Sequence, residues 1–312
     1  MVIISYLGPR GTFTEEALLS QPDLATGDLV PQRSVPEVLT TVARRESDLG
    51  FVPIENSIEG SVSATLDTLA FETDLLIQRE VDLPISLHLC ARPGTGLGDV
   101  KAVLAHPHAA AQCREWMARK IPGVEVRAAN SNAEAAVTVS KTKRGGLAAV
   151  GTARAAGLYG LEVLASEIED HPDNETRFVL VGRGIPAPTG HDKTSIVCFQ
   201  RANRPGSLLA ILQEFAARSV DLVKLESRPT KQSLGDYCFF MDCVGHVADE
   251  VVADALRSLV AKQARVKFLG SYPVGGTGQA AVVRRRAASR SWRQASAWVE
   301  ELRSRIGEDG PT

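Results

Sequence analysis

The sequence predicts an α/β domain with mostly parallel sheets over residues 1–185 and a smaller α+β domain over residues 194–273. Three observations support this. The chain has 312 residues, more than one ordinary hydrophobic core usually needs. Short β-rich runs alternate with helical stretches through its first part, which is typical of α/β architecture. A Gly/Pro-rich stretch at 182–190 then interrupts this alternation, and a different order of elements follows.

Within the first domain, β-branched and apolar runs predict strands at 2–7, 49–54, 85–91, 100–105, 124–128, 147–150 and 178–181. Helices are expected between them at 13–20, 35–46, 63–71, 107–120, 132–142 and 152–158. Two helix starts are marked by capping-box spacing, Thr12 with Glu15 and Ser131 with Glu134. Pro107 suits the first turn of another helix.

Residues 186–193 are predicted to be an interdomain linker. The elements expected after it are strand 194–200, helix 206–218, strands 221–228 and 236–244, helix 249–262 and strand 265–272. This order is the βαββαβ, or ferredoxin-like, plan.

Residues 274–312 form a tail with seven arginines against four acidic residues. Trp292, Trp298, Val299 and Leu302 could form an apolar stripe on a terminal helix. The arginines could be a solvated helix face or a subunit contact.

Composition excludes several classes of protein. Hydrophobic residues make up 44% of the chain and charged residues 23%, as in soluble globular proteins. The 35 basic residues nearly balance the 37 acidic ones, so neither nucleic acid nor a membrane surface is expected as a partner. No signal peptide or membrane span is expected, and five irregularly spaced cysteines do not suggest a disulfide framework. The sequence therefore indicates a cytoplasmic protein.

Polar turns follow several predicted strands of the first domain, at 8–14, 53–57 and 130–132. Open α/β sheets bind ligands at the carboxyl ends of their strands, and helix N-termini favour anions. A small organic acid with several negative charges would fit such a site. Ordinary helix capping would explain any one of these turns alone.

The run Asn174-Glu175-Thr176-Arg177-Phe178 is more specific. Arg177 offers two parallel donors to a carboxylate, and Thr176 offers a small donor that can approach a leaving hydroxyl. A capped turn with a surface arginine is the alternative. His106 and His108 lack a third ligand at a familiar spacing, so no metal site is expected, and no phosphate-binding loop is present.

These motifs resemble the prephenate dehydratase family. The resemblance rests on Asn174-x-Thr176-Arg177-Phe178 and on the runs Tyr6–Thr14, Pro53–Ser57 and His106-Pro-x-x-x-x-Gln112. The second domain resembles an ACT domain, an amino-acid sensor, through Glu226-Ser-Arg-Pro229 and Gly206-Ser-Leu-Leu209. The resemblance covers residues 2 to about 273, and the motifs occur there in the same order as in the family.

The resemblance implies a catalytic domain similar to periplasmic-binding-protein folds, with two α/β lobes around a cleft. One lobe would hold about 1–80 and a return strand near 176–185. The implied reaction converts prephenate to phenylpyruvate, water and carbon dioxide without a cofactor. The implied partners are L-phenylalanine as an allosteric effector and further copies of the chain, in a homodimer or homotetramer.

The resemblance and the residue chemistry together nominate three sets of residues. The expected catalytic residues are Thr176 as hydrogen-bond donor to the departing hydroxyl, Arg177 as carboxylate clamp, Glu55 and Asn56. The expected substrate-binding residues are Thr12, Phe13, Ser57, Gln112, Ser131, Asn174 and Phe178. The expected phenylalanine site consists of Asn203, Pro205, Gly206, Ser207, Leu208, Leu209, Glu226, Ser227, Arg228 and Pro229.

Two other functions fit the same residues. An arogenate dehydratase would differ by one small contact, because its substrate carries an amino group in place of a keto oxygen. A non-catalytic amino-acid sensor on a solute-binding fold would not need a site for hydroxyl departure. The chain also departs from the family at Ala105, where many members carry serine, and at Ser207, where alanine is usual.

Overall fold

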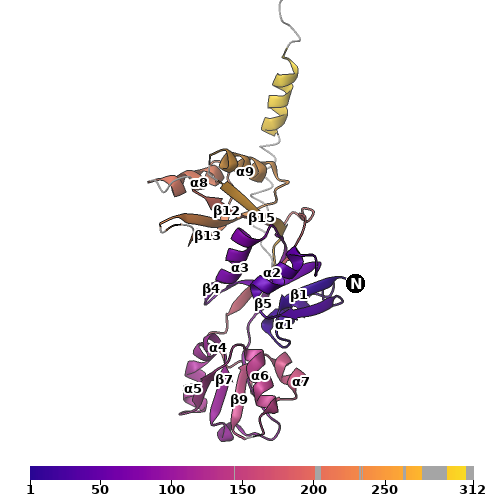
Figure 1. The fold of residues 1–312 in the computed structure, drawn as a ribbon. Coiled ribbons are helices and arrows are strands. Elements are labelled where there is room, and N and C mark those ends of the chain that lie inside the picture. The colour runs from indigo at the N-terminus through magenta and orange to yellow at the C-terminus, as the bar shows by residue number, and fades with distance from the viewer. Residues whose placement is uncertain are drawn as a thin grey trace, which may run out of the picture. The chain divides into compact units, whose positions relative to one another are not determined.

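The computed structural model describes residues 1–143, 145–200, 205–231, 233, 235–262, 265–275 and 294–306. The chain divides into two compact units (Figure 1). The first comprises Met1–Leu75 and Val81–Gly182, and the second comprises Leu76–Glu80 and Arg183–Thr312. Among the helices of these described ranges, none is long and apolar enough to cross a membrane.

The first lobe of the first unit contains a sheet in the order β2-β1-β3-β11-β5, with β4 paired to β3; the part of β5 at Leu76–Glu80 belongs to the second unit. Phe51 and Phe178 stack at its centre, with ring centroids 5.6 Å apart, and both are buried. The strands are β1 (Ile3–Leu7), β2 (Asp28–Gln32), β3 (Leu49–Asn56), β4 (Gly60–Ser61), β5 (Leu76–Pro84) and β11 (Glu175–Gly182). The helices are α1 (Phe13–Leu19), α2 (Val35–Ala43), α3 (Ser63–Asp67) and a π-helical turn, Thr68–Glu72.

The second lobe contains a sheet in the order β10-β6-β9-β7-β8. Its interior is rich in alanine, and small side chains on α6 and α7 allow these helices to approach the strands closely. The strands are β6 (His88–Ala91), β7 (Ala102–Ala105), β8 (Glu125–Ala128), β9 (Leu147–Gly151) and β10 (Glu162–Ala165). The helices are a 3₁₀ turn (Leu97–Asp99), α4 (Pro107–Gln112), α5 (Arg114–Lys120), α6 (Asn132–Lys141) and α7 (Ala153–Tyr159).

The predicted two-lobed α/β plan is confirmed, but the prediction of mostly parallel sheets is wrong. β1 pairs in parallel with β2 and β3, and β7 with β8 and β9. β11 pairs antiparallel with β3, and β6 pairs antiparallel with β9 and β10. The antiparallel pairs arise because β6 and β11 each enter their sheet from the other lobe rather than through a helical crossover.

Several elements were missed by the sequence pattern. β2, β5 and β10 carry proline or charged residues among their apolar ones, so they lack the continuous apolar run that marked the other strands. The helix expected at 107–120 is divided at Cys113, whose backbone (φ −114°, ψ 12°) leaves the helical region.

The second unit has the predicted βαββαβ order, with a sheet in the order β13-β14-β12-β15. Its strands are β12 (Asp192–Phe199), β13 (Leu222–Pro229), β14 (Tyr237–Val244) and β15 (Arg265–Pro273), and its helices are α8 (Ser207–Ala216) and α9 (Glu250–Lys262). β12 begins two residues before the predicted boundary, so Asp192 and Lys193 are strand residues rather than linker. Both are buried. Lys193 forms an ion pair of 2.7 Å with Glu80, in the middle of β5.

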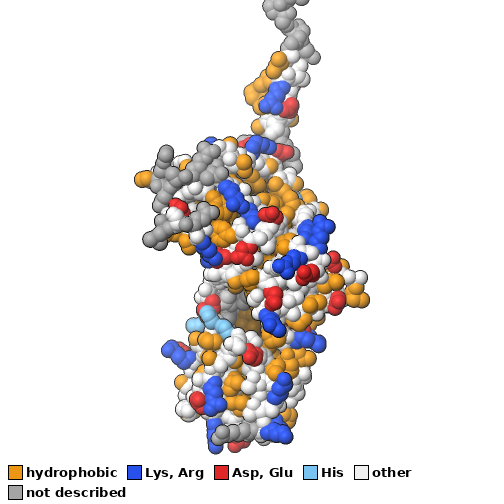
Figure 2. Space-filling model, in the orientation of Figure 1, with side chains coloured by type: hydrophobic (Ala, Val, Ile, Leu, Met, Phe, Trp, Pro, Cys, Tyr) orange, Lys and Arg blue, Asp and Glu red, His pale blue; other side chains and the backbone are white. Residues whose placement is uncertain are grey.

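The tail forms a helix at 294–304 whose residues are exposed. Trp298, Val299 and Leu302, three residues of the predicted stripe, lie on this helix and are exposed, and Figure 2 shows hydrophobic side chains on it. Trp292 and the arginines at 284–286, 290 and 293 lie outside the described residues.

Gly270 in β15 supports a prediction about stability. It has φ +142°, and an added Cβ would lie 2.5 Å from the carbonyl oxygen of Ile77. Gly270→Ala should therefore lower the free energy of unfolding by about 3 kcal/mol, through backbone strain and overpacking together. Gly184→Ala is the control, because Gly184 also has a positive φ (+80°) but no atom within 4 Å of an added Cβ. Urea unfolding measures the free energy of unfolding of both variants, and equal losses in Gly270→Ala and Gly184→Ala would contradict the packing argument.

Candidate functional site

A cavity of about 870 Å³ lies in the first unit and is lined by both lobes. The first lobe contributes the turn at residues 7–14 with Pro53, Thr176 and Phe178. The second lobe contributes His106, the start of α6 at 130–134 and Thr152. A recess is visible between the two lobes in Figure 2, with histidine side chains beside it. The predicted polar turns therefore do meet around one cavity.

The pairing of β3 with β11 places Asn56 opposite Thr176. Nδ2 of Asn56 donates to Oγ1 of Thr176 at 2.8 Å and to Oδ1 of Asn174 at 2.8 Å. Oδ1 of Asn56 accepts the backbone N–H groups of Ile58 and Glu59, both at 3.0 Å, which fixes the orientation of the amide. A threonine hydroxyl has one proton, and Asn56 occupies an acceptor position of Thr176. The proton of Thr176 is therefore available to a group in the cavity.

A chain of hydrogen bonds continues from Asn174 to the surface of the second lobe. Nδ2 of Asn174 donates to Oε1 of Gln112 at 3.1 Å, and Nε2 of Gln112 approaches Oε1 of Glu59 at 3.3 Å. Oε2 of Glu59 lies 2.7 Å from Nδ1 of His108. Because a carboxylate only accepts, Glu59 sets the direction of the amide chain as far as Asn174. Gln112 and Asn174 thus support Thr176 from behind rather than lining the cavity.

The structure does not place Arg177 in the cavity lining. Side chains alternate along a strand, so Thr176 and Phe178 face the cavity while Arg177 points away from it. Its Nη1 donates to Oε2 of Glu55 at 2.8 Å, and its Nε lies 3.5 Å from Oδ1 of Asp82. Arg177 is therefore engaged by two carboxylates of the protein, which does not fit the expected role as a substrate clamp.

Groups other than Arg177 supply the positive potential in the cavity. Among the described lining residues, Arg33 is the one with a permanent positive charge, and it is exposed. The first turn of α6 also faces the cavity, where the N–H groups of Asn132 and Ala133 have no acceptor within the helix. Burial and the neighbouring His108 lower the pKa of His106, against an opposing effect of Glu59, so His106 is predominantly neutral at pH 7.

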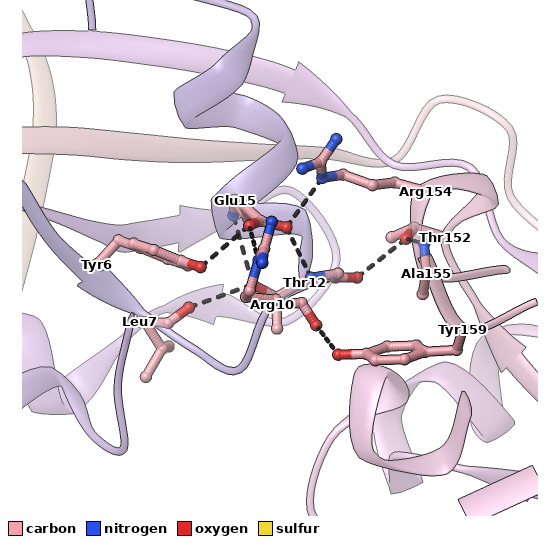
Figure 3. Close-up of polar contacts among 10 residues, drawn as sticks. Tyr6, Leu7, Arg10, Thr12, Glu15, Thr152, Arg154, Ala155 and Tyr159 are labelled. Atoms are coloured by element: carbon pink, nitrogen blue, oxygen red, sulfur yellow. Dashed lines mark hydrogen bonds and ion pairs between the residues drawn. The ribbon is translucent and has the colours of Figure 1, made fainter. Parts of the chain in front are cut away.

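The carboxylate of Glu15 organises the turn that precedes α1 (Figure 3). It accepts hydrogen bonds from Tyr6 Oη at 3.1 Å, the Gly11 N–H at 2.7 Å and Arg154 Nε at 2.8 Å. Burial raises the pKa of Glu15, but the bonds from Arg154 and Gly11 outweigh burial, so the net shift is downward. Glu15 is thus an ionised, buried carboxylate beside the cavity wall.

A second cavity, of about 590 Å³, lies in the second unit. Five residues of the predicted effector set line it: Gly206, Ser207, Leu208, Leu209 and Ser227. Pro205, Glu226, Arg228 and Pro229 are not in its lining, and Asn203 lies outside the described residues. Glu226 instead forms an ion pair with Arg228 at 3.2 Å. Strand alternation explains this, since Ser227 faces the cavity and its two neighbours do not.

Of the residues predicted for the substrate site, Thr12, Phe13, Ser131, Thr176 and Phe178 line the first cavity. Glu55, Asn56, Ser57, Gln112, Asn174 and Arg177 surround that wall without lining it. Ser57 accepts the backbone N–H of Glu175 at 3.0 Å and so holds the start of β11. Ala105 is buried and lies outside the lining. Within the described ranges, no group of three or more His, Cys, Asp or Glu is placed to hold a metal ion.

Sequence reasoning missed Arg33 and Glu59, and it used Glu15 only as a capping residue. The signal for Glu15 was present, because an acidic residue on the buried face of a short amphipathic helix requires partners. In the second cavity it missed Gln200, which follows β12, Leu212 of α8, and Tyr237 and Phe239 of β14.

The fold and the two cavities define a two-lobed α/β protein with a cavity lined by both lobes, followed by an α+β unit with a cavity of its own. Residues 4–185 match the family model for prephenate dehydratase, and residues 194–261 match that for the ACT domain. The chain belongs to the prephenate dehydratase family.

Three relatives illustrate this similarity. A prephenate dehydratase of Mycolicibacterium vanbaalenii is 45% identical over 96% of this chain and 98% of its own length. The crystal structure of prephenate dehydratase from Arthrobacter aurescens in complex with L-Phe has a TM-score of 0.87 and 39% identity, covering 97% of this chain and all of that one. GqqA, described as a novel type of quorum quenching acylase, has a TM-score of 0.79 and 29% identity over 88% of this chain and 98% of its own.

The lowered pKa of Glu15 predicts how stability depends on pH. A carboxylate with a lowered pKa stabilises the folded state above its ordinary pKa of about 4.5, and that contribution is lost as pH falls through the folded-state value. The difference in free energy of unfolding between the wild type and Glu15→Gln should therefore be largest above pH 5 and shrink on acidification. Urea unfolding from pH 3 to 7 measures this difference, and a constant difference would contradict it.

Proposed function

We propose that the chain converts prephenate to phenylpyruvate, with loss of water and carbon dioxide, and that phenylalanine regulates it through the ACT domain. The observation that carries the proposal is Thr176, a hydroxyl on the cavity wall whose acceptor side is occupied by Asn56 and whose proton is free for a ligand. Membership of the family and the 870 Å³ cavity support the choice of substrate.

The reaction requires a proton for the departing ring hydroxyl and an electron pair released from the ring carboxylate. A hydrogen bond from Thr176 that strengthens as the C–O bond breaks stabilises the transition state more than the bound substrate. Threonine is too weak an acid to protonate the oxygen outright, so water or the medium supplies the proton that completes the leaving water molecule. As carbon dioxide leaves, the electron pair of the bond between the ring and the carboxylate carbon enters the ring, and the resulting aromatic ring makes the step favourable.

The two carboxylates of prephenate have different requirements. The carboxylate of the pyruvyl arm keeps its charge, so it is suited to Arg33 and the free N–H groups at the start of α6. The ring carboxylate loses its charge during the reaction, so strong binding of it would slow decarboxylation. Arg177 has a positioning role in this proposal: it holds Glu55 across the strand pair, next to Asn56.

Thr176 provides the central test of the mechanism. Thr176→Ala should lower kcat by about 100-fold or more and change KM by less than about threefold, because the hydrogen bond acts in the transition state. Thr176→Ser, which keeps the hydroxyl, should recover much of kcat. Phenylpyruvate formation from prephenate measures both constants. A raised KM with unchanged kcat would show that the Thr176 hydroxyl takes no part in the chemical step.

The substrate itself is tested with the wild-type protein, using prephenate and arogenate in parallel, each with and without phenylalanine. Turnover of prephenate that phenylalanine inhibits is expected. Turnover of arogenate alone would assign the chain as an arogenate dehydratase. Binding of phenylalanine without turnover of either substrate would make it a sensor.

Arg33 and Arg177 can be compared directly. Arg33→Met should raise KM for prephenate about tenfold with little change in kcat, because it removes a charge-assisted contact made equally in both states. Arg177→Met should lower kcat more than it raises KM, because Glu55 loses its partner beside Asn56. The opposite pattern in steady-state kinetics would restore Arg177 as the clamp.

The regulatory part of the proposal rests on the 590 Å³ cavity at the start of α8. Gly206, with φ +83°, leads into α8, so the cavity meets free backbone N–H groups suited to the effector's carboxylate, while Leu208, Leu212 and Phe239 are suited to its ring. We also propose that the enzyme acts in the cytoplasm, consistent with five buried free thiols, and that it forms a homodimer or homotetramer.

A further inference from the structure

The turn at residues 8–14 forms a wall of the catalytic cavity and is held from both lobes. Gly8, Pro9, Gly11, Thr12, Phe13 and Thr14 all line the cavity. The hydroxyl of Thr12 is used within the turn, because it donates to the Leu7 carbonyl at 3.2 Å and accepts the Glu15 N–H at 3.3 Å. The position of this wall therefore depends on what fixes the turn.

The second lobe supplies three polar contacts to this turn (Figure 3). Arg154 Nε donates to Oε2 of Glu15 at 2.8 Å, the same oxygen that accepts the Gly11 N–H. Oγ1 of Thr152 donates to the Gly11 carbonyl at 3.0 Å. Oη of Tyr159 donates to the Arg10 carbonyl at 2.7 Å. All three side chains come from α7 or its N-cap.

Packing reinforces this connection. An added Cβ at Gly11 would lie 3.1 Å from the Cβ of Ala155 and 3.2 Å from its Cα, so the turn and α7 approach as closely as glycine permits. The carboxylate of Glu15 is buried and accepts both from its own turn and from Arg154, whose side chain is 36% exposed. The Thr152 contact is buried, whereas Arg154 and Tyr159 are the partly exposed members of this link between the lobes.

We propose that Arg154 is a positioning residue for the substrate, acting through Glu15 to hold the wall formed by residues 8–14 in its binding-competent position. The inference deepens the proposed function and rests on it for the identity of the substrate. Arg154 does not line the cavity, so its effect reaches prephenate through the turn. Without this link, the wall occupies several positions, and only one of them binds the substrate well. The apparent dissociation constant for the substrate then rises by the inverse of the fraction of molecules in that position.

The expected result is a rise in KM without a matching loss of kcat. Arg154→Met should raise KM for prephenate about tenfold and leave kcat within about threefold. We expect kcat to be retained because Thr176 and Asn56 lie on the paired strands β3 and β11 and not on the turn at residues 8–14. Arg154→Lys keeps the charge and should recover part of the affinity. Arg127→Met is the matched control, because Arg127 also lies in the second lobe and pairs with a carboxylate, Glu125, at 2.6 Å, on exposed β8.

A double-mutant cycle identifies the route of this effect. If Arg154 acts through Glu15, then Glu15→Gln and Arg154→Met should each raise KM, and the double variant should raise it little more than the stronger single variant. Additive effects would show that Arg154 acts on the substrate by another route and would overturn the proposal.

Amide hydrogen exchange without substrate provides a readout that does not depend on turnover. Arg154→Met should accelerate exchange at residues 11–14, whereas Arg127→Met should not. Lower thermal stability with unchanged KM and unchanged exchange would assign Arg154 a purely structural role and overturn the proposal. If the wild type did not turn over prephenate but the exchange result held, the proposed substrate would fail while the positioning of the turn would stand.

Discussion

The antiparallel pairing of β3 with β11 is the constraint on which the rest of the catalytic unit depends. It joins residues 120 positions apart and sets Asn56 opposite Thr176 and Glu55 opposite Arg177. The pairing also closes the unit, because β11 is the strand by which the chain returns from the second lobe to the first. One ladder of backbone hydrogen bonds therefore defines both the lobe arrangement and the direction in which the Thr176 hydroxyl can donate.

The sequence was informative wherever local chemistry determines structure. The capping side chains of Thr12 and Ser131 correctly marked helix starts, and the βαββαβ order of the second unit followed from apolar periodicity. The directions in which strands pair could not be read locally. Whether β11 pairs parallel or antiparallel with β3 depends on where the chain crosses between the lobes. The local sequence of β11 does not determine this direction.

The same distinction applies to the site. Motifs identified the neighbourhood of Thr176, whereas the carboxylate role expected for Arg177 rested on the two parallel donors of its side chain alone. In a strand neighbouring residues face opposite sides, so Arg177 contacts Glu55 and Asp82 while Thr176 lines the cavity. Arg33 and Arg154 belong to no motif, and only tertiary structure brings them to the cavity or to Glu15.

The distribution of charge is suited to a decarboxylation. A cavity that surrounded both carboxylates of a dicarboxylic acid with arginines would bind it tightly and slow the loss of carbon dioxide, because the departing carboxylate must give up its charge. Here Arg177 is paired with Glu55 and Asp82, and Arg154 shares the carboxylate of Glu15 with Arg10. Arg33 and the start of α6 remain for the carboxylate that persists. The ion pairs around the cavity thus limit its positive potential as well as holding its walls.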